Sequence, residues 1–127
     1  DAEFDVVFSN SVIEHLGNFA AQMRMANEVR RVGKRYFIQT PNLFFPLEPH
    51  FLVPGFQFFP LGLRAWMVSS FDVGWYRRIP DLHQARAEVE SVRLLSRTDL
   101  RRLFPEARIY KERFAGIVKS FVAYHGW

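Results

Sequence analysis

The chain has 127 residues, of which 49% are hydrophobic and 24% charged, with a formal net charge of +4; this size and composition are typical of one globular domain. It contains no cysteine, which excludes disulfides and thiolate metal sites, and no apolar run of about eighteen residues, so we expect no transmembrane segment. The basic residues are scattered, which favours a solvated surface over a nucleic-acid partner. The acidic N-terminus is unlike a signal peptide, and we expect a cytoplasmic protein.

The N-terminal segment predicts a strand that leads into a helix. Residues 4–8 (FDVVF) form a short apolar run that is typical of a buried β-strand. Three small polar residues, Ser9, Asn10 and Ser11, follow it, and residues 12–16 begin a short helix. In α/β sheets, the residues that follow the carboxyl ends of strands line the crevice that binds ligands.

The next segment predicts an amphipathic helix and a second strand. Apolar residues recur at helical spacing from residue 19 to residue 29, and Gly33 is expected to end the helix. Residues 36–40 (YFIQT) predict a strand, and a strand–helix–strand order gives a right-handed parallel crossover. On the polar side of the helix we place Gln22, Arg24, Glu28 and Arg31.

Residues 41–93 differ from the rest of the chain. Five prolines between residues 41 and 60 exclude a long helix there, and residues 61–69 and 81–93 predict two short helices. Ten aromatic residues lie between residues 44 and 76. Two interpretations stay open: an apolar lid for a hydrophobic ligand or a lipid surface, and a small aromatic core of this segment's own.

The C-terminal segment predicts a helix and a hairpin. Residues 96–104 predict a helix that Ser96 or Thr98 caps and Pro105 ends. Residues 107–114 and 118–124 predict two antiparallel strands around a turn at Ala115 and Gly116.

Three segments, in chain order, resemble parts of class I S-adenosylmethionine (SAM)-dependent methyltransferases. They are FDVVFSNSVIEHL (residues 4–16), ANEVRRVGKRYFIQTPN (26–42) and LLSRTDLRRLFPEARIYKERFAGIVKSFVAYHGW (94–127). The resemblance implies an α/β fold with a partial Rossmann-like methyltransferase sheet. Its family strands would lie in the order four, five, seven, six, the last one antiparallel. Residues 1–127 would form a single partial domain, with helices and an aromatic-rich lid inserted at residues 41–93.

The resemblance also implies an activity. The chain would be the C-terminal part of a larger catalytic domain that transfers a methyl group from SAM to a small apolar acceptor. The family's glycine-rich loop and ribose-binding acid lie upstream of Asp1 in the family pattern, so we expect the isolated chain to bind SAM weakly or not at all and to be inactive. The alternative is a non-catalytic half-domain that acts as a binding or oligomerisation module, with a homodimer formed through the first strand.

The same resemblance assigns the site residues. Ser9, Asn10 and Ser11 would bind the cofactor; as an alternative, they only end a strand and cap a helix. Glu14 and His15 would be catalytic, because an adjacent acid and imidazole can move a proton, although His15 could also be structural.

The acceptor side and the metal content follow in the same way. Some family members carry a Glu-x-x-Glu-His metal motif at this place, but Ser11 stands here at the first Glu position. The remaining carboxylate and imidazole are too few for a hard cation unless Glu48 and His50 supply further ligands, and we expect no metal. The substrate-binding residues are expected to be Asn42, Glu48, His50 and Phe51.

Overall fold

The computed structural model covers residues 1–127 and describes all of them except Glu48, so the expected role of Glu48 lies outside the described residues. The chain divides into two compact units. Unit 1 consists of residues 1–45 and 93–127, and unit 2 of residues 46–92. The chain thus leaves unit 1 once and returns to it once.

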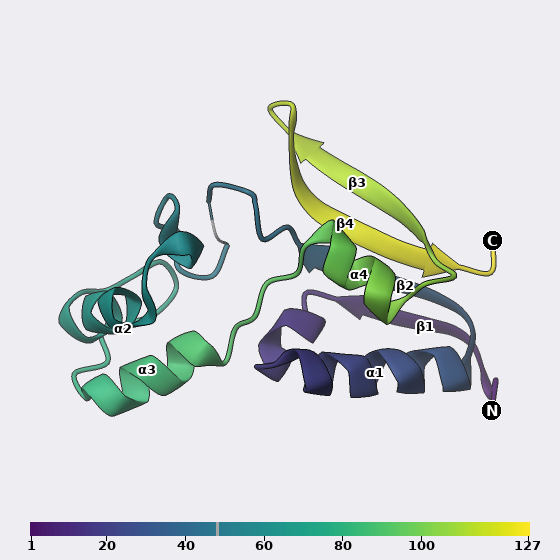
Figure 1. The fold of residues 1–127 in the computed structure, drawn as a ribbon, viewed down its shortest axis with the longest axis horizontal. Helices are drawn as coiled ribbons and strands as arrows, with labels where there is room; N and C mark the ends of the chain where they lie inside the picture. The colour runs from purple at the N-terminus through teal and green to yellow at the C-terminus, as the bar shows by residue number, and fades with distance from the viewer. Residues whose placement is uncertain (48) are drawn as a thin grey trace. The chain divides into compact units, whose positions relative to one another are not determined.

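Unit 1 is built on a four-stranded mixed sheet (Figure 1). Strands β1 (Phe4–Asn10) and β2 (Gly33–Pro41) are parallel. Strand β4 (Ile117–His125) is antiparallel to β2 and to β3 (Arg108–Phe114). The order across the sheet is β1-β2-β4-β3, so the expected α/β class, strand order and antiparallel last strand are confirmed.

The crossover between the parallel strands contains a short 3-10 helix, η1 (Ile13–Leu16), and then α1 (Phe19–Val32). The Asn18 side chain accepts a hydrogen bond from the Ala21 N–H at 2.8 Å and so caps the start of α1. Gly33 ends the helix as predicted, but β2 begins there, three residues earlier than expected. A Cβ on Gly33 would lie 2.8 Å from Val7 Cγ2, so only glycine lets β1 approach this closely.

The core of unit 1 lies between the sheet and two helices, α1 and α4 (Arg97–Leu103). Ser96 caps α4 as predicted: its hydroxyl accepts from the Asp99 N–H, and the Asp99 carboxylate accepts from the Ser96 N–H. Apolar side chains from one face of the sheet meet those of the helices. The largest buried ones are Ile13, Tyr36, Ile38, Leu95, Leu100, Leu103 and Phe104.

The Glu106 carboxylate joins α1 and β2 to the loop after α4. The Tyr36 hydroxyl donates to Glu106 Oε1 at 3.0 Å, and Arg30 Nε donates to the same oxygen at 2.7 Å. Burial and the Glu106 carboxylate raise the pKa of Tyr36. Burial alone would raise the pKa of Glu106, but the hydrogen bonds from Arg30 and Tyr36 outweigh it and lower that pKa. The stabilisation is therefore present at neutral pH and is lost as the pH falls through the folded-state pKa of Glu106.

Within unit 1, the opposite face of the sheet carries exposed apolar side chains. Val7 packs against the core, whereas Phe4, Val6 and Phe8 are exposed. The prediction of a buried strand over residues 4–8 is therefore wrong for one of its two faces. The reason is that β1 is an edge strand that pairs, among the described residues, with β2 only.

Unit 2 has its own small core. It contains a 3-10 turn, η2 (Phe56–Phe58), and two helices, α2 (Leu61–Ser70) and α3 (Leu82–Glu90). The Phe51 ring stacks on Phe56 and on Tyr76, with ring centroids 4.5 and 4.7 Å apart. Both predicted helices are present, but α3 ends at Glu90, earlier than residue 93. None of the helices in the described part of the chain is long and apolar enough to cross a membrane.

Candidate functional site

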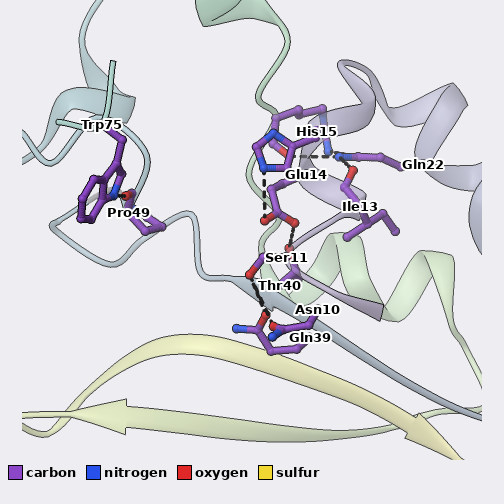
Figure 2. Close-up of polar contacts among 11 residues, drawn as sticks. Asn10, Ser11, Ile13, Glu14, His15, Gln22, Gln39, Thr40, Pro49 and Trp75 are labelled. Carbon is purple, nitrogen blue, oxygen red and sulfur yellow. Dashed lines mark hydrogen bonds and ion pairs between the residues drawn. The ribbon is translucent and has the colours of Figure 1, made fainter. Parts of the chain in front are cut away.

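The candidate site lies in unit 1, at the edge of the sheet where β1 and β2 both end. Because the two strands are parallel and Asn10 is in register with Gln39, their carboxyl ends meet at this edge. The side chains of Asn10 and Ser11 are exposed there (Figure 2), whereas Ser9 is buried. Of the three residues expected to bind the cofactor, only Asn10 and Ser11 therefore present side chains at the surface of unit 1.

Ser11 holds an unusual backbone conformation. Its φ angle is +54°, in the left-handed region that residues other than glycine rarely adopt. The Ser11 N–H donates to the Gln39 carbonyl at 3.0 Å, and its hydroxyl donates to Gln39 Oε1 at 2.9 Å. These two bonds attach the turn after β1 to the end of β2, which compensates for the backbone strain.

Glu14 and His15 form an acid–imidazole pair directly after this turn (Figure 2). The Glu14 carboxylate is fully buried and accepts a hydrogen bond from the Thr40 hydroxyl at 3.0 Å. His15 Nε2 lies 4.0 Å from Glu14 Oε1, and the His15 side chain is 42% exposed. A fixed carboxylate beside an imidazole orients the ring and stabilises the imidazolium that forms when the ring accepts a proton.

A buried amide holds the η1 segment in place. Gln22 Nε2 donates to the Ile13 carbonyl at 3.2 Å and to the Arg93 carbonyl at 3.0 Å. Gln22 Oε1 accepts from the Arg93 guanidinium at 2.9 Å, and the Arg93 N–H donates to the Glu14 carbonyl at 2.7 Å. The prediction that Gln22 lies on the polar side of α1 is wrong, because its side chain is fully buried.

Asn42, expected to bind substrate, makes hydrogen bonds within unit 1. Its side-chain amide donates to the Val118 carbonyl at 2.7 Å, and its side-chain oxygen accepts from the Phe44 N–H at 3.1 Å. Its backbone N–H donates to the Lys119 carbonyl at 2.9 Å. Asn42 therefore attaches the segment after β2 to the start of β4.

The remaining acceptor-side residues belong to unit 2. His50 is half-buried, and its carbonyl accepts from the Trp75 N–H at 3.3 Å. Phe51 is buried in the core of unit 2, where its ring packs on two other aromatic rings. Within unit 1, Glu14 and His15 alone offer one carboxylate and one imidazole, fewer ligands than a hard cation takes.

Sequence reasoning missed three residues that build the site: Gln22, Thr40 and Arg93. One signal could have found the first of them. Gln22, Ala26 and Val29 are spaced by four and three positions, which places all three on one helix face, and all three are buried. Thr40 and Arg93 carry no such signal, because their partners are far away in the sequence.

The chain is similar to two proteins of Mycobacterium tuberculosis. It is 39% identical over 56 residues to the uncharacterized protein Rv1509 of strain H37Rv, a match that covers 44% of this chain and 19% of that protein. The same values hold for the uncharacterized protein MT1557 of strain CDC 1551. The matched part of the chain thus spans about a fifth of the length of these relatives. No family model and no solved structure matches the chain.

The conformation of Ser11 leads to a prediction about stability. Replacing Ser11 with Gly or with Ala removes the same hydroxyl hydrogen bond, but only glycine relieves the left-handed strain, which costs other residues about 1 kcal/mol. Ser11→Ala should therefore lower the free energy of unfolding by about 1 kcal/mol more than Ser11→Gly. Urea denaturation of both variants measures the difference, and equal losses would show that the turn is not strained.

Proposed function

We propose that this chain is the C-terminal part of a SAM-dependent methyltransferase domain with a Rossmann-like sheet, and that it acts on a small apolar acceptor. One observation carries the proposal: exposed Asn10 and Ser11 lie beside the His15–Glu14 pair at the shared carboxyl end of two parallel strands. Ligands bind at this end of open α/β sheets. The strand order β1-β2-β4-β3 supports the same reading.

The residues at this edge fit one part of the cofactor. Asn10 and Ser11 offer an amide and a hydroxyl, which suit the charged amino-acid end of SAM. SAM, when bound, supplies a methyl group on a sulfonium sulfur. The family's glycine-rich loop and ribose-binding acid have no counterpart among these residues, so this chain provides one side of the binding site.

His15 is the proposed base. The imidazole accepts the proton that an acceptor hydroxyl loses as its oxygen forms the new bond to carbon. The ring then carries a positive charge next to the buried Glu14 carboxylate, 4.0 Å away. The Thr40 hydroxyl holds that carboxylate in place at 3.0 Å. In this proposal His15 takes the proton of the acceptor, while Glu14 and Thr40 keep the imidazole oriented.

The test is the His15→Gln variant. In a protein that includes any sequence its gene encodes before Asp1, this change should lower methyl transfer from labelled SAM to apolar phenols and alcohols by about 100-fold, the usual contribution of a general base. The SAM dissociation constant, measured by calorimetry, should change little. His83→Gln is the matched control, since His83 is an exposed histidine on α3.

Two results would count against His15 as the general base. One is an unchanged rate in His15→Gln. The other is a loss of SAM affinity as large as the loss of rate, which would assign His15 to the cofactor side.

A second candidate function, an oligomerisation module, is favoured by the difference between the two edges of the sheet. The edge strand β3 carries Arg108, Lys111, Glu112 and Arg113 and has an irregularity between Glu112 and Arg113, features that prevent strands of other molecules from pairing. Strand β1 carries one charged residue, Asp5, which is neutralised by Lys34 at 2.8 Å.

The exposed face of β1 is also symmetric. It reads Phe4, Val6, Phe8, so an antiparallel second copy centred on Val6 would place Phe against Phe and Val against Val. A two-fold interface requires such self-complementarity. The symmetric apolar face supports a homodimer of the 127-residue chain through β1. The edge position of β1 and its single charged residue support the same homodimer.

The dimer is tested by two matched lysine variants. Val6 and Ile117 are β-branched strand residues with nearly equal exposure, 46% and 48%. In analytical ultracentrifugation at micromolar concentration, the unaltered chain and Ile117→Lys should sediment as dimers and Val6→Lys as a monomer, because lysine at a strand edge blocks pairing. A monomeric unaltered chain would exclude this module.

A further inference from the structure

The exposed face of α2 is apolar, which is the reverse of an ordinary surface helix. The residues of α2 that are exposed are Gly62, Leu63 and Trp66. Ala65 and Val68 point into the core of unit 2, and Arg64 is half-buried. The core of unit 2 is already complete on the other side of the helix, so this apolar face is additional to it.

The apolar surface continues beyond the end of α2. The Phe71 ring packs edge-on against Trp66, with centroids 5.8 Å apart, and both rings are more than half exposed. Trp75 is 80% exposed, and its indole N–H donates to the Pro49 carbonyl at 3.1 Å, which fixes the ring in the exposed position (Figure 2). These rings are held in place rather than loosely exposed.

Positive charge borders the aromatic residues. Arg77 and Arg78 are both exposed. Arg78 Nε donates to the Ser69 carbonyl at 3.0 Å, and the Arg78 N–H donates to the Asp72 carboxylate at 2.8 Å. The first bond holds the Arg78 guanidinium at the C-terminal end of α2, close to Phe71 in the chain. Asp72 is the one acidic residue between residues 71 and 78, and its carboxylate accepts the second of these bonds.

A hollow lies on the N-terminal side of the same helix. Its volume is about 400 Å³, and it is lined by Gly62, Ala65, Leu82, His83 and Arg86. Its walls thus combine apolar groups of α2 and α3 with His83 and with Arg86, whose guanidinium pairs with Glu90 at 3.3 Å. A Cβ on Gly62 would meet no atom within 4 Å, so the hollow is open at that point.

We propose that this face of unit 2, the α2 surface, docks on a lipid bilayer that contains anionic lipids. We define the α2 surface as Leu63, Trp66, Phe71, Arg77 and Arg78. Leucine, tryptophan and phenylalanine suit the boundary between headgroups and acyl chains, and arginine suits the phosphates above it. The inference concerns unit 2 alone and goes beyond the proposed methyl transfer.

Charge complementarity favours a lipid surface over a protein partner. Juxtamembrane arginines contribute about 1 kcal/mol each on an anionic leaflet, which is about fivefold in the partition coefficient. Aromatic residues without charged neighbours on the helix face insert without leaving a charge in the apolar layer. On the α2 surface the Arg78 guanidinium lies at the C-terminal end of α2, the exposed Arg77 precedes it in the chain, and the exposed residues of α2 itself are uncharged.

The experiment measures sedimentation of the full chain with two kinds of vesicle, phosphatidylcholine alone and equal parts of phosphatidylcholine and phosphatidylglycerol. The unaltered chain should bind the anionic vesicles more tightly, and less so at high salt. The double change Arg77→Gln and Arg78→Gln should lower partitioning onto anionic vesicles about fivefold for each arginine removed. It should leave partitioning onto neutral vesicles unchanged.

Substitutions at Gly62 test insertion into the bilayer without disturbing the fold, because a Cβ at this position would meet no atom within 4 Å. Gly62→Asp should reduce binding to both vesicles, and Gly62→Leu should increase it. Neither assay requires SAM or methyl transfer, so the outcome is independent of the proposed function.

The control variants carry the same kinds of substitution, arginine to glutamine and an uncharged residue to aspartate, on α4 in unit 1. They are Arg97→Gln with Arg101→Gln, two exposed arginines, and Thr98→Asp, an exposed first-turn position. These variants should bind both vesicles like the unaltered chain. Absence of vesicle binding by the unaltered chain, or equal losses in the control variants, would overturn the proposal.

Discussion

Unit 1 depends on one buried side-chain amide, that of Gln22. The chain leaves unit 1 after residue 45 and returns at residue 93, and Gln22 bonds to both the Ile13 carbonyl and the returning Arg93. A buried polar group left without partners costs about 1–3 kcal/mol, so loss of this amide would leave two carbonyls and a guanidinium to be satisfied elsewhere. The Arg93 N–H bond to the Glu14 carbonyl completes the closure. Both α1, through Gln22, and the returning chain, through Arg93, therefore hold the 3-10 helix η1 in place.

This closure has consequences for both units. It fixes the backbone on both sides of Glu14, whose carboxylate then meets the Thr40 hydroxyl at the end of β2. The acid–imidazole pair is thus supported by β2, α1 and the returning chain. Residues 46–92 have a core of their own around Phe51, Phe56 and Val68. An inserted segment of this kind can change its surface without disturbing the fold that carries it.

The sequence predicts the helices and strands better than it predicts the burial and the contacts of individual side chains. Apolar runs, helical spacing and caps such as Ser96 are local signals, and the strands and helices that they predict are present. The burial of Gln22 and the contact between Thr40 and Glu14 depend on residues that meet only after folding. The exposed face of β1 could not be read from its apolar residues, because exposure depends on the strand's place in the sheet. The left-handed Ser11 gives no signal at all, since serine is ordinary at a turn.

The central proposal is that this chain forms one side of a SAM site, and that the other side consists of the glycine-rich loop and the ribose-binding acid, which lie upstream of Asp1 in the family pattern. Calorimetric titration of SAM into two proteins tests it most directly: the 127-residue chain, and the chain with any sequence that its gene encodes before Asp1. We predict micromolar binding by the longer protein and much weaker binding by the 127-residue chain, because the proposed contacts of the exposed Asn10 and Ser11 reach one end of the cofactor only. Micromolar binding by the 127-residue chain alone, or no binding by the longer protein, would contradict it.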